Sequence, residues 1–346
     1  METRTRLLIA AIFFMCITPA LTFRSFSSRA FQHSTPYYGR SMLQGQKTLT
    51  TGIRTDLEVV LEVAETAAKE AGKIIQDNMG ASVKNEKSNH RDLVTKYDGM
   101  CEKIIVELIN ERFPHHIILG EESVAAGTHA SVLALSEKLR DLDNYSSEED
   151  DEPMLWVIDP IDGTTNFAMG LPLAVVSIGI YYKGQAVVGT IYHPALDECF
   201  TAIRGQGAKL NGERIQVRDD AELKDAVINC GFCPNPRALE VCARGMEALR
   251  HEVRGLRMFA SAALVMSWIA SGRLSGYFSY DLNAWDLAAG SLILEEAGGK
   301  ITDLDGTEYG LETRNMLASN GILHPVILKE LRKANAISLD GGEWKF

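Results

Sequence analysis

Residues 154–167, M-L-W-V-I-D-P-I-D-G-T-T-N-F, constrain the possible folds of this chain more than any other segment. The apolar run at 154–158 predicts a short buried strand. A proline and a glycine shortly after it predict that the strand stops and turns there. Asp159 and Asp162 are therefore expected at the mouth of a strand, with both carboxylates facing the same point.

Two carboxylates at this spacing need a partner. About 4 Å apart they repel each other by roughly 4 kcal/mol at an effective dielectric near 20, and a hard divalent cation would offset that repulsion. Gly163, Thr164 and Thr165 follow directly, and their N–H groups and hydroxyls at an expected helix start suit a phosphate. The segment therefore predicts metal-assisted phosphoryl chemistry. A turn that merely caps the strand would explain the two aspartates alone, but not the whole segment.

Four segments resemble the motifs of the inositol monophosphatase family, in the family's order. They are D-L-V-T-K-Y-D at 92–98, G-E-E-S at 120–123, W-V-I-D-P-I-D-G-T-T-N-F at 156–167 and W-D-L-A-A-G-S-L-I-L-E-E-A-G-G at 285–299. The resemblance spans residues 55–335, and A-S-N-G-I-L-H-P at 318–325 is most similar to plastid-type members of plants and algae. It implies a mixed α/β fold, a layered α-β-α-β-α sandwich of the sugar-phosphatase type, and a homodimer.

The resemblance also implies a magnesium site with two or three Mg²⁺ ions. Glu121, Asp159 and the carbonyl of Ile161 would hold the first ion. Asp159, Asp162 and Asp286 would hold the second, with Asp159 bridging the two. All of these are hard oxygen donors, as Mg²⁺ requires, and no His or Cys is among them.

Catalytic and substrate-binding roles follow from the same motif match. Asp98 would orient Thr164, which would position the attacking water beside the first metal and its ligand Glu121. The expected substrate is a small phosphate ester. The residues expected to face it are Asp162, Gly163, Thr164, Ser261, Ala262, Ser279 and Asp286.

One position departs from the family pattern. Seven residues before Asp286 the family typically has a glutamate that binds substrate hydroxyls, and here the residue is Ser279. A serine cannot supply that charged acceptor. The resemblance therefore implies phosphatase activity more firmly than it implies specificity for inositol phosphate.

Other activities remain open on the residues alone. The haloacid-dehalogenase type of phosphatase has a similar D-x-D-G-T motif, but its acids stand two residues apart, whereas Asp159 and Asp162 stand three apart. Bisphosphate nucleotidases, fructose bisphosphatases and histidinol phosphatases share the metal layout. A catalytically silent binding protein on the same fold would be expected to lack one of the predicted ligands, and none is missing.

Composition narrows the class of partner. The chain has 346 residues, of which 46% are hydrophobic and 23% charged, and a net charge of −11. This is typical of a soluble enzyme with a sizeable core. The negative charge argues against nucleic acid as a partner and implies that metal recruits an anionic substrate.

Cys230 and Cys233 form a C-x-x-C without a second pair, so zinc is not predicted.

Residues 1–53 have the composition of a targeting leader. Arg4 and Arg6 precede an apolar run at 7–17, a signal-peptide layout that is shorter than the ~20 residues of a membrane span. No Asp or Glu occurs at 3–55, while Ser, Thr and Arg recur, which is typical of a transit peptide. Signal followed by transit predicts import into a plastid, with a mitochondrion or the secretory pathway as alternatives. The mature form is expected to have no membrane partner.

Residues 54–346 are expected to form the catalytic domain. A capping-box pattern at Thr55 and Glu58 predicts the start of its first helix. Residues 123–153 are expected to be a long acidic loop, solvated around 146–152, and Asn211-Gly212 predicts a hairpin. Periodicity predicts helices at 57–75, 99–113, 237–253, 260–270 and 286–297, and strands at 117–119, 174–182, 185–193, 198–204, 226–229, 276–279 and 300–302.

Overall fold

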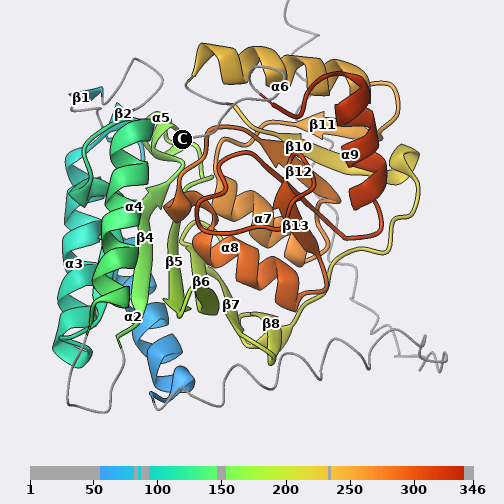
Figure 1. Ribbon diagram of the computed structural model, residues 1–346. Helices are drawn as coiled ribbons and strands as arrows, with labels where there is room; N and C mark the ends of the chain where they lie inside the picture. Colours follow the sequence, from blue (N-terminus) through green and yellow to red (C-terminus); the bar gives the residue numbers. More distant parts are fainter. Residues whose placement is uncertain (1–54, 82–84, 87–92, 146–152, 233–234, 339–346) are drawn as a thin grey trace, which may run out of the picture. The chain divides into compact units, whose positions relative to one another are not determined.

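A computed structural model describes residues 55–81, 85–86, 93–145, 153–232 and 235–338, all of which belong to one compact unit (Figure 1). The predicted leader, the acidic run at 146–152, Asp92 and Cys233 lie outside the described residues. Within the described residues, no helix combines the length and the apolar character that crossing a membrane requires.

The larger sheet has seven strands in the order β3-β4-β5-β6-β7-β8-β9. They are β3 (Ile117–Gly120), β4 (Leu155–Asp162), β5 (Val175–Tyr182), β6 (Gln185–His193), β7 (Glu198–Ile203), β8 (Gly207–Leu210) and β9 (Glu213–Arg214). β3 and β4 are parallel and the other pairs are antiparallel. The hairpin predicted at Asn211-Gly212 is confirmed: both residues have positive φ, as a type I′ turn requires, and they join β8 to β9.

The smaller sheet has five strands in the order β11-β10-β12-β14-β13. They are β10 (Val227–Cys230), β11 (Gly255–Arg257), β12 (Gly276–Ser279), β13 (Lys300–Asp303) and β14 (Met316–Ser319). β10 is parallel to β11 and β12, whereas β14 is antiparallel to β12 and β13. β11 and β14 were not predicted. A separate hairpin joins β1 (Asn85–Glu86) to β2 (Leu93–Val94).

Helices cover both faces of each sheet, which confirms the predicted α-β-α-β-α sandwich (Figure 1). The outer pair on the larger sheet is α2 (Leu57–Asp77) and α3 (Lys96–Arg112), the pair between the sheets is α7 (Ala262–Ala270) and α8 (Ala284–Glu296), and the outer pair on the smaller sheet is α6 (Pro236–Leu249) and α9 (His324–Lys333). Side chains alternate between the two faces of β4, so this strand contacts two of these helix layers. Trp156 and Ile158 pack under α2 and α3, whereas Leu155 and Val157 face the layer of α7 and α8.

Close contact between α8 and the larger sheet sets the position of that helix. A Cβ atom at Gly179 on β5 would lie 2.7 Å from the Cβ of Ala288, and one at Gly189 on β6 would lie 2.9 Å from the carbonyl oxygen of Ala289. Side chains at these two glycines would push the helix away from the sheet. The glycines therefore place the first turn of α8, which carries Asp286, against the end of β4.

The first residues of α2 and α3 are capped differently from the prediction. Asp56, and not Thr55, caps α2 by accepting a hydrogen bond from the N–H of Glu58 at 3.0 Å. α3 begins three residues earlier than predicted because Thr95 caps it and Asp98 completes a capping box. Asp98 consequently lies in the first turn of a helix.

The predicted loop at 123–153 is wrong over half its length, because α4 (Thr128–Asp143) lies within it and packs on β3. Leu135, Leu139 and Leu142 form the inner face of α4, and their spacing of four and three residues was a helical signal in the sequence. α9 was also missed. α4 has 16 residues and α9 has 10.

The predicted end of the central strand is also wrong. β4 continues through Pro160 to Asp162 instead of stopping after Ile158. The pairing of β4 with β5 shifts register between Asp159 and Asp162. A proline without an N–H is tolerated at such an irregularity, because the ladder lacks a hydrogen bond there.

Candidate active site

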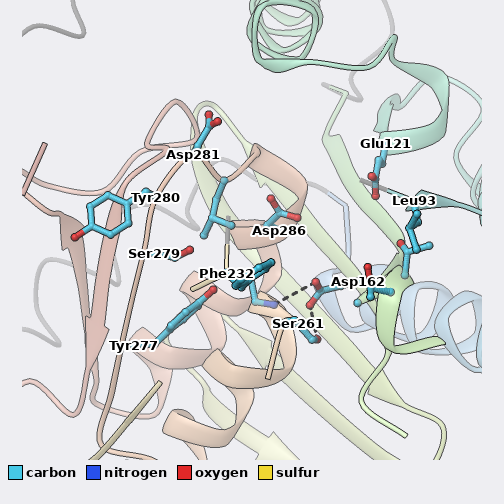
Figure 2. A pocket seen from close by; sticks show the side chains of 16 residues that line it. Leu93, Glu121, Asp162, Phe232, Ser261, Tyr277, Ser279, Tyr280, Asp281 and Asp286 are labelled. Carbon is cyan, nitrogen blue, oxygen red and sulfur yellow. Dashed lines mark hydrogen bonds between the residues drawn. The ribbon is translucent and has the colours of Figure 1, made fainter. Parts of the chain in front are cut away.

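Four acidic side chains from three parts of the fold meet at the end of β4. Asp159 and Asp162 come from β4, Asp286 from the first turn of α8, and Glu121 from the 3₁₀ turn that follows β3. Parallel pairing of β3 with β4 places Gly120 opposite Ile158, so the next residue of each segment, Glu121 or Asp159, is close to the other. Carboxylate oxygens of Asp159, Asp162 and Asp286 lie within 4.8 Å of one another, and Figure 2 shows Glu121 facing the same space.

Burial and mutual repulsion favour protons on Asp159 and Asp286. Asp159 is 2% exposed, and burial, followed by the charges of Glu121, Asp162 and Asp286, raises its pKa well above the ordinary value. Burial, followed by Asp162 and Glu121, raises the pKa of Asp286 to about 8. A cluster of oxygen donors that binds protons this tightly fits a divalent cation, which would neutralise the same charges.

The N-terminus of α7 holds Asp162 in place. Its carboxylate accepts hydrogen bonds from the Ser261 hydroxyl at 2.7 Å, the Ala262 N–H at 3.1 Å and the Ala263 N–H at 2.7 Å. Burial raises the pKa of Asp162, and these hydrogen bonds act in the opposite direction. Ser261 and Ala262 line the pocket as predicted, but their donors are directed at Asp162 and not at open space.

The turn after β4 brings Thr164 to Asp98. Gly163 has φ 93°, and a Cβ there would lie 2.7 Å from the carbonyl oxygen of Leu173, so the turn into α5 (Thr164–Met169) requires glycine. The Thr164 hydroxyl lies 3.3 Å from Asp98 Oδ1 and 3.1 Å from the carbonyl oxygen of Ile161, and can donate to either. The predicted contact between Thr164 and Asp98 is therefore present.

A buried carboxylate that the sequence analysis missed fixes the turn that carries Glu121. Glu102, 6% exposed on α3, accepts a hydrogen bond from the N–H of Glu122 at 2.7 Å and another from the Ser123 hydroxyl. Its carboxylate fills the space beside Gly120. Asp98 and Glu102 stand four residues apart on the buried face of α3, and two acids on a buried helix face were the available signal.

A second missed carboxylate, Asp281, lines the pocket beside Leu282. Its Oδ1 accepts from Arg314 Nη2 at 2.8 Å and from the Thr128 hydroxyl at 3.2 Å. Its Oδ2 accepts from Asn235 Nδ2 at 3.2 Å. These bonds join α4, the N-cap of α6 and the approach to α8, so α4 is part of the scaffold of the site.

Arg314 also steadies the start of α8. Its Nη1 donates to Asn283 Oδ1 at 3.2 Å, and the N–H of Asn283 donates to Asp286 Oδ2 at 2.6 Å. The positive charge of Arg314 acts to lower the pKa of Asp286, against the larger effect of burial. Asn283 therefore links Arg314 to a candidate metal ligand through two hydrogen bonds.

These groups surround a pocket of about 340 Å³. Ser279, at the end of β12, is 1% exposed and packs against Gly231 in its wall. The predicted residues that line the pocket are Glu121, Asp162, Gly163, Thr164, Ser261, Ala262, Ser279 and Asp286. Asp98 and Ile161 contact the pocket through Thr164, and Asp159 lies against Glu121, Asp162 and Asp286.

Comparison with known proteins agrees with this geometry. The model of the inositol monophosphatase family matches residues 56–336. Inositol monophosphatase 3 of Solanum lycopersicum is 36% identical over 280 residues, which cover 80% of this chain and 98% of the relative. Nus factor SuhB of Pasteurella multocida is 36% identical over 79% of this chain and 94% of its own length.

A solved structure is similar over the same region. The inositol monophosphatase of Anabaena (Nostoc) sp. PCC 7120 superposes with a TM-score of 0.66 at 34% sequence identity, covering 81% of this chain and 97% of its own. Sequence, fold and site geometry agree. The chain belongs to the inositol monophosphatase family.

Proposed function

We propose that this chain is a Mg²⁺-dependent phosphomonoesterase that hydrolyses inositol monophosphate or a related small sugar or polyol phosphate. One observation carries the proposal: three carboxylates, Asp159, Asp162 and Asp286, converge within 4.8 Å beside a pocket. Carboxylates that bind no ligand rarely cluster in a buried site without a cationic partner, because their mutual repulsion and their desolvation destabilise the fold.

Two or three Mg²⁺ ions would be held by Glu121, Asp159, the Ile161 carbonyl, Asp162 and Asp286. Bound there, they would supply Lewis-acid stabilisation of the phosphate and lower the pKa of a water molecule toward neutrality. Ser261 and the N-terminus of α7 keep the Asp162 carboxylate directed at the site. Glu102 does the same for the turn of Glu121.

Thr164 and Asp98 would position the attacking water. When the Thr164 hydroxyl donates to Asp98 Oδ1, its lone pairs are left to accept a hydrogen bond from water. The other oxygen of Asp98 is fixed by the N–H of Thr95 at 2.8 Å and the Thr95 hydroxyl at 2.6 Å. The attacking water would lose one proton to solvent and bond through its oxygen to phosphorus. The P–O ester bond would break, and the leaving alkoxide would take a proton from solvent. The N–H groups of Gly163 and Thr164 would bind the phosphate oxygens.

A substrate panel tests this function. Inositol 1-phosphate, glycerol 2-phosphate, histidinol phosphate, fructose 1,6-bisphosphate and adenosine 3′,5′-bisphosphate would each be assayed for phosphate release with saturating Mg²⁺. The proposal expects release from the monoesters that exceeds release from the bisphosphates. Faster hydrolysis of a bisphosphate would favour the nucleotidase or fructose bisphosphatase alternative, and no hydrolysis of any compound would overturn phosphatase activity.

Ser279→Glu is expected to shift selectivity toward inositol phosphate. The side chain at this position lines the pocket, and a glutamate would add a charged acceptor for substrate hydroxyls. Hydrogen bonds of this kind contribute roughly 1.5–3 kcal/mol, which is about one to two decades at 1.4 kcal/mol per decade. The measurement is kcat/KM for inositol 1-phosphate relative to phenyl phosphate, which has no vicinal hydroxyls.

Ser279→Gln is the matched control, because it has the length of glutamate without the charge. The Mg²⁺ requirement should be the same in all three proteins. Two results would contradict the prediction: a hundredfold preference for inositol phosphate already in the wild type, or a selectivity ratio that Ser279→Glu leaves unchanged.

We also propose that residues 1–53 direct the protein to a plastid and are then removed. The support is the acid-free, Ser- and Arg-bearing stretch behind a short apolar run. A fluorescent fusion of residues 1–60 is expected to accumulate in plastids of an alga or plant cell. Accumulation in mitochondria would assign the protein to that organelle instead, and fluorescence that stays in the cytosol would refute import.

A further inference from the structure

The turn before α7 directs Asp162 and has an unfavourable backbone conformation. Ser261 and the first two N–H groups of α7 donate to the carboxylate oxygens of Asp162 at 2.7 to 3.1 Å (Figure 2). Ala260, the residue before Ser261, lines the pocket and has φ 53°, in the left-handed region that favours glycine. Contacts outside the turn must therefore keep it in this conformation.

Two buried asparagine side chains bind this turn from opposite sides. Asn229, 1% exposed on β10, accepts a hydrogen bond from the N–H of Phe259 at 3.1 Å. Asn166, 5% exposed on α5, donates from Nδ2 to the Phe259 carbonyl at 2.7 Å and to the Ala260 carbonyl at 3.2 Å. The turn is thus fixed by the smaller sheet on one side and by α5 on the other.

Asn166 also lies behind the turn that is proposed to bind phosphate. It follows Thr164 by two residues, and its Nδ2 donates to the Leu173 carbonyl at 3.0 Å. A Cβ atom at Gly163 would lie 3.3 Å from this nitrogen and 3.2 Å from the Cβ of Ser261. The two hydrogens of the amide are shared among three carbonyl oxygens, so Asn166 joins three backbone segments around the site.

We propose that Asn166 is a positioning residue for metal binding. By holding the carbonyls of Phe259 and Ala260, it keeps the turn in the form in which Ser261 and α7 direct the carboxylate of Asp162 at the site. Without these bonds Ala260 would relax to negative φ, and Ser261 would turn away from Asp162. This inference rests on the proposed function, because it takes Asp162 as a Mg²⁺ ligand.

Asn166→Ala is expected to raise the Mg²⁺ concentration for half-maximal activity about tenfold, as is typical when a group that orients a metal ligand is lost. At saturating Mg²⁺, kcat should stay within about threefold of the wild type, because the reacting groups are unchanged. Calorimetric titration of Mg²⁺ into metal-free protein should show the same loss of affinity without turnover. Asn166→Ser keeps one donor and should have an intermediate affinity, which provides the test if Asn166→Ala does not fold.

Ala260→Gly tests whether Asn166 acts through the turn. Glycine adopts positive φ as readily as negative φ, so the turn should keep its form with fewer external contacts. In the Asn166→Ala background, Ala260→Gly should recover most of the lost Mg²⁺ affinity. In the wild type the same substitution should change the affinity less than about twofold, so the two substitutions are expected to be non-additive.

Asn320→Ala is the matched control, because Asn320 is another buried asparagine, 2% exposed. Its side chain donates to the Asp220 carbonyl at 2.9 Å and accepts from the Leu323 N–H at 3.0 Å. Asn320→Ala should lower the melting temperature, as Asn166→Ala does, and leave the Mg²⁺ affinity unchanged.

Two results would overturn the positioning role: equal Mg²⁺ affinity in the wild type and Asn166→Ala, or a loss of affinity that Ala260→Gly does not reverse. Protein that shows the expected pattern of Mg²⁺ affinities but hydrolyses no phosphomonoester would overturn only the phosphatase function. Wild-type protein that binds no Mg²⁺ would overturn both.

Discussion

Asp159→Asn is expected to lower phosphatase turnover by roughly a thousandfold or more and to raise the melting temperature of the metal-free protein. Loss of activity follows because Asp159 is the proposed bridging ligand, and an amide binds Mg²⁺ far more weakly than a carboxylate. The gain in stability follows because Asp159 is 2% exposed among the charges of Glu121, Asp162 and Asp286. An amide of the same shape removes that repulsion and the desolvation of a charge.

Thermal unfolding with EDTA and with Mg²⁺ separates the two effects. About 1 kcal/mol of added stability corresponds to roughly 2–4 °C for a domain of this size, so the metal-free variant should melt a few degrees above the metal-free wild type. Mg²⁺ should then stabilise the wild type, because ligand binds only the folded state, and should leave the variant nearly unchanged.

Asp141→Asn provides the comparison for charge removal alone, since Asp141 is exposed on α4. It should alter neither turnover nor the response to Mg²⁺. Retained turnover in Asp159→Asn would contradict the role of Asp159 as a bridging metal ligand. A metal-free variant less stable than the metal-free wild type would contradict repulsion among the carboxylates.

Residue patterns alone predict only the part of the site that lies within one local motif. Asp159, Asp162 and Thr164 are close in the chain, so a strand followed by a turn was enough to bring them together. The position of Asp286 depends on Gly179 and Gly189, which let α8 approach the sheet. That packing relation joins segments about a hundred residues apart and has no local signature, so only the family resemblance indicated it.

The residues that position the site lie outside the sequence motifs and could not be predicted from them. Arg314 pairs with Asp281 from 33 residues away, and Asp281 is also bound by Thr128 from a helix that the sequence analysis treated as loop. Glu102 binds the turn of Glu122 across 20 residues. Such partners are chosen by the distances between packed elements, and single residues of common types at irregular spacings do not reveal them.

Removal of metal is expected to abolish turnover and to make stability depend steeply on pH. Burial raises the pKa of Asp286 to about 8, and the pKa values of Asp159 and Asp162 are also raised. An acid whose pKa is higher in the folded than in the unfolded protein binds its proton more tightly in the folded state. Stability is then greatest at low pH, falls as the pH rises from about 4 through about 8, and levels off above that.

Melting temperatures in EDTA at pH 5, 6, 7 and 8 would measure this slope. Each pH unit within the window costs about 1.4 kcal/mol for one such group, or about 3–5 °C for a domain of this size. Asp286→Asn is the matched control: it should flatten the slope, because the titrating group is gone. Stabilisation by Mg²⁺ should grow over the same range in the wild type, since metal competes with protons for the carboxylates. Full turnover in EDTA would contradict the requirement for metal. A melting temperature that rises from pH 5 to 8 in metal-free wild type but not in Asp286→Asn would contradict a raised pKa of Asp286.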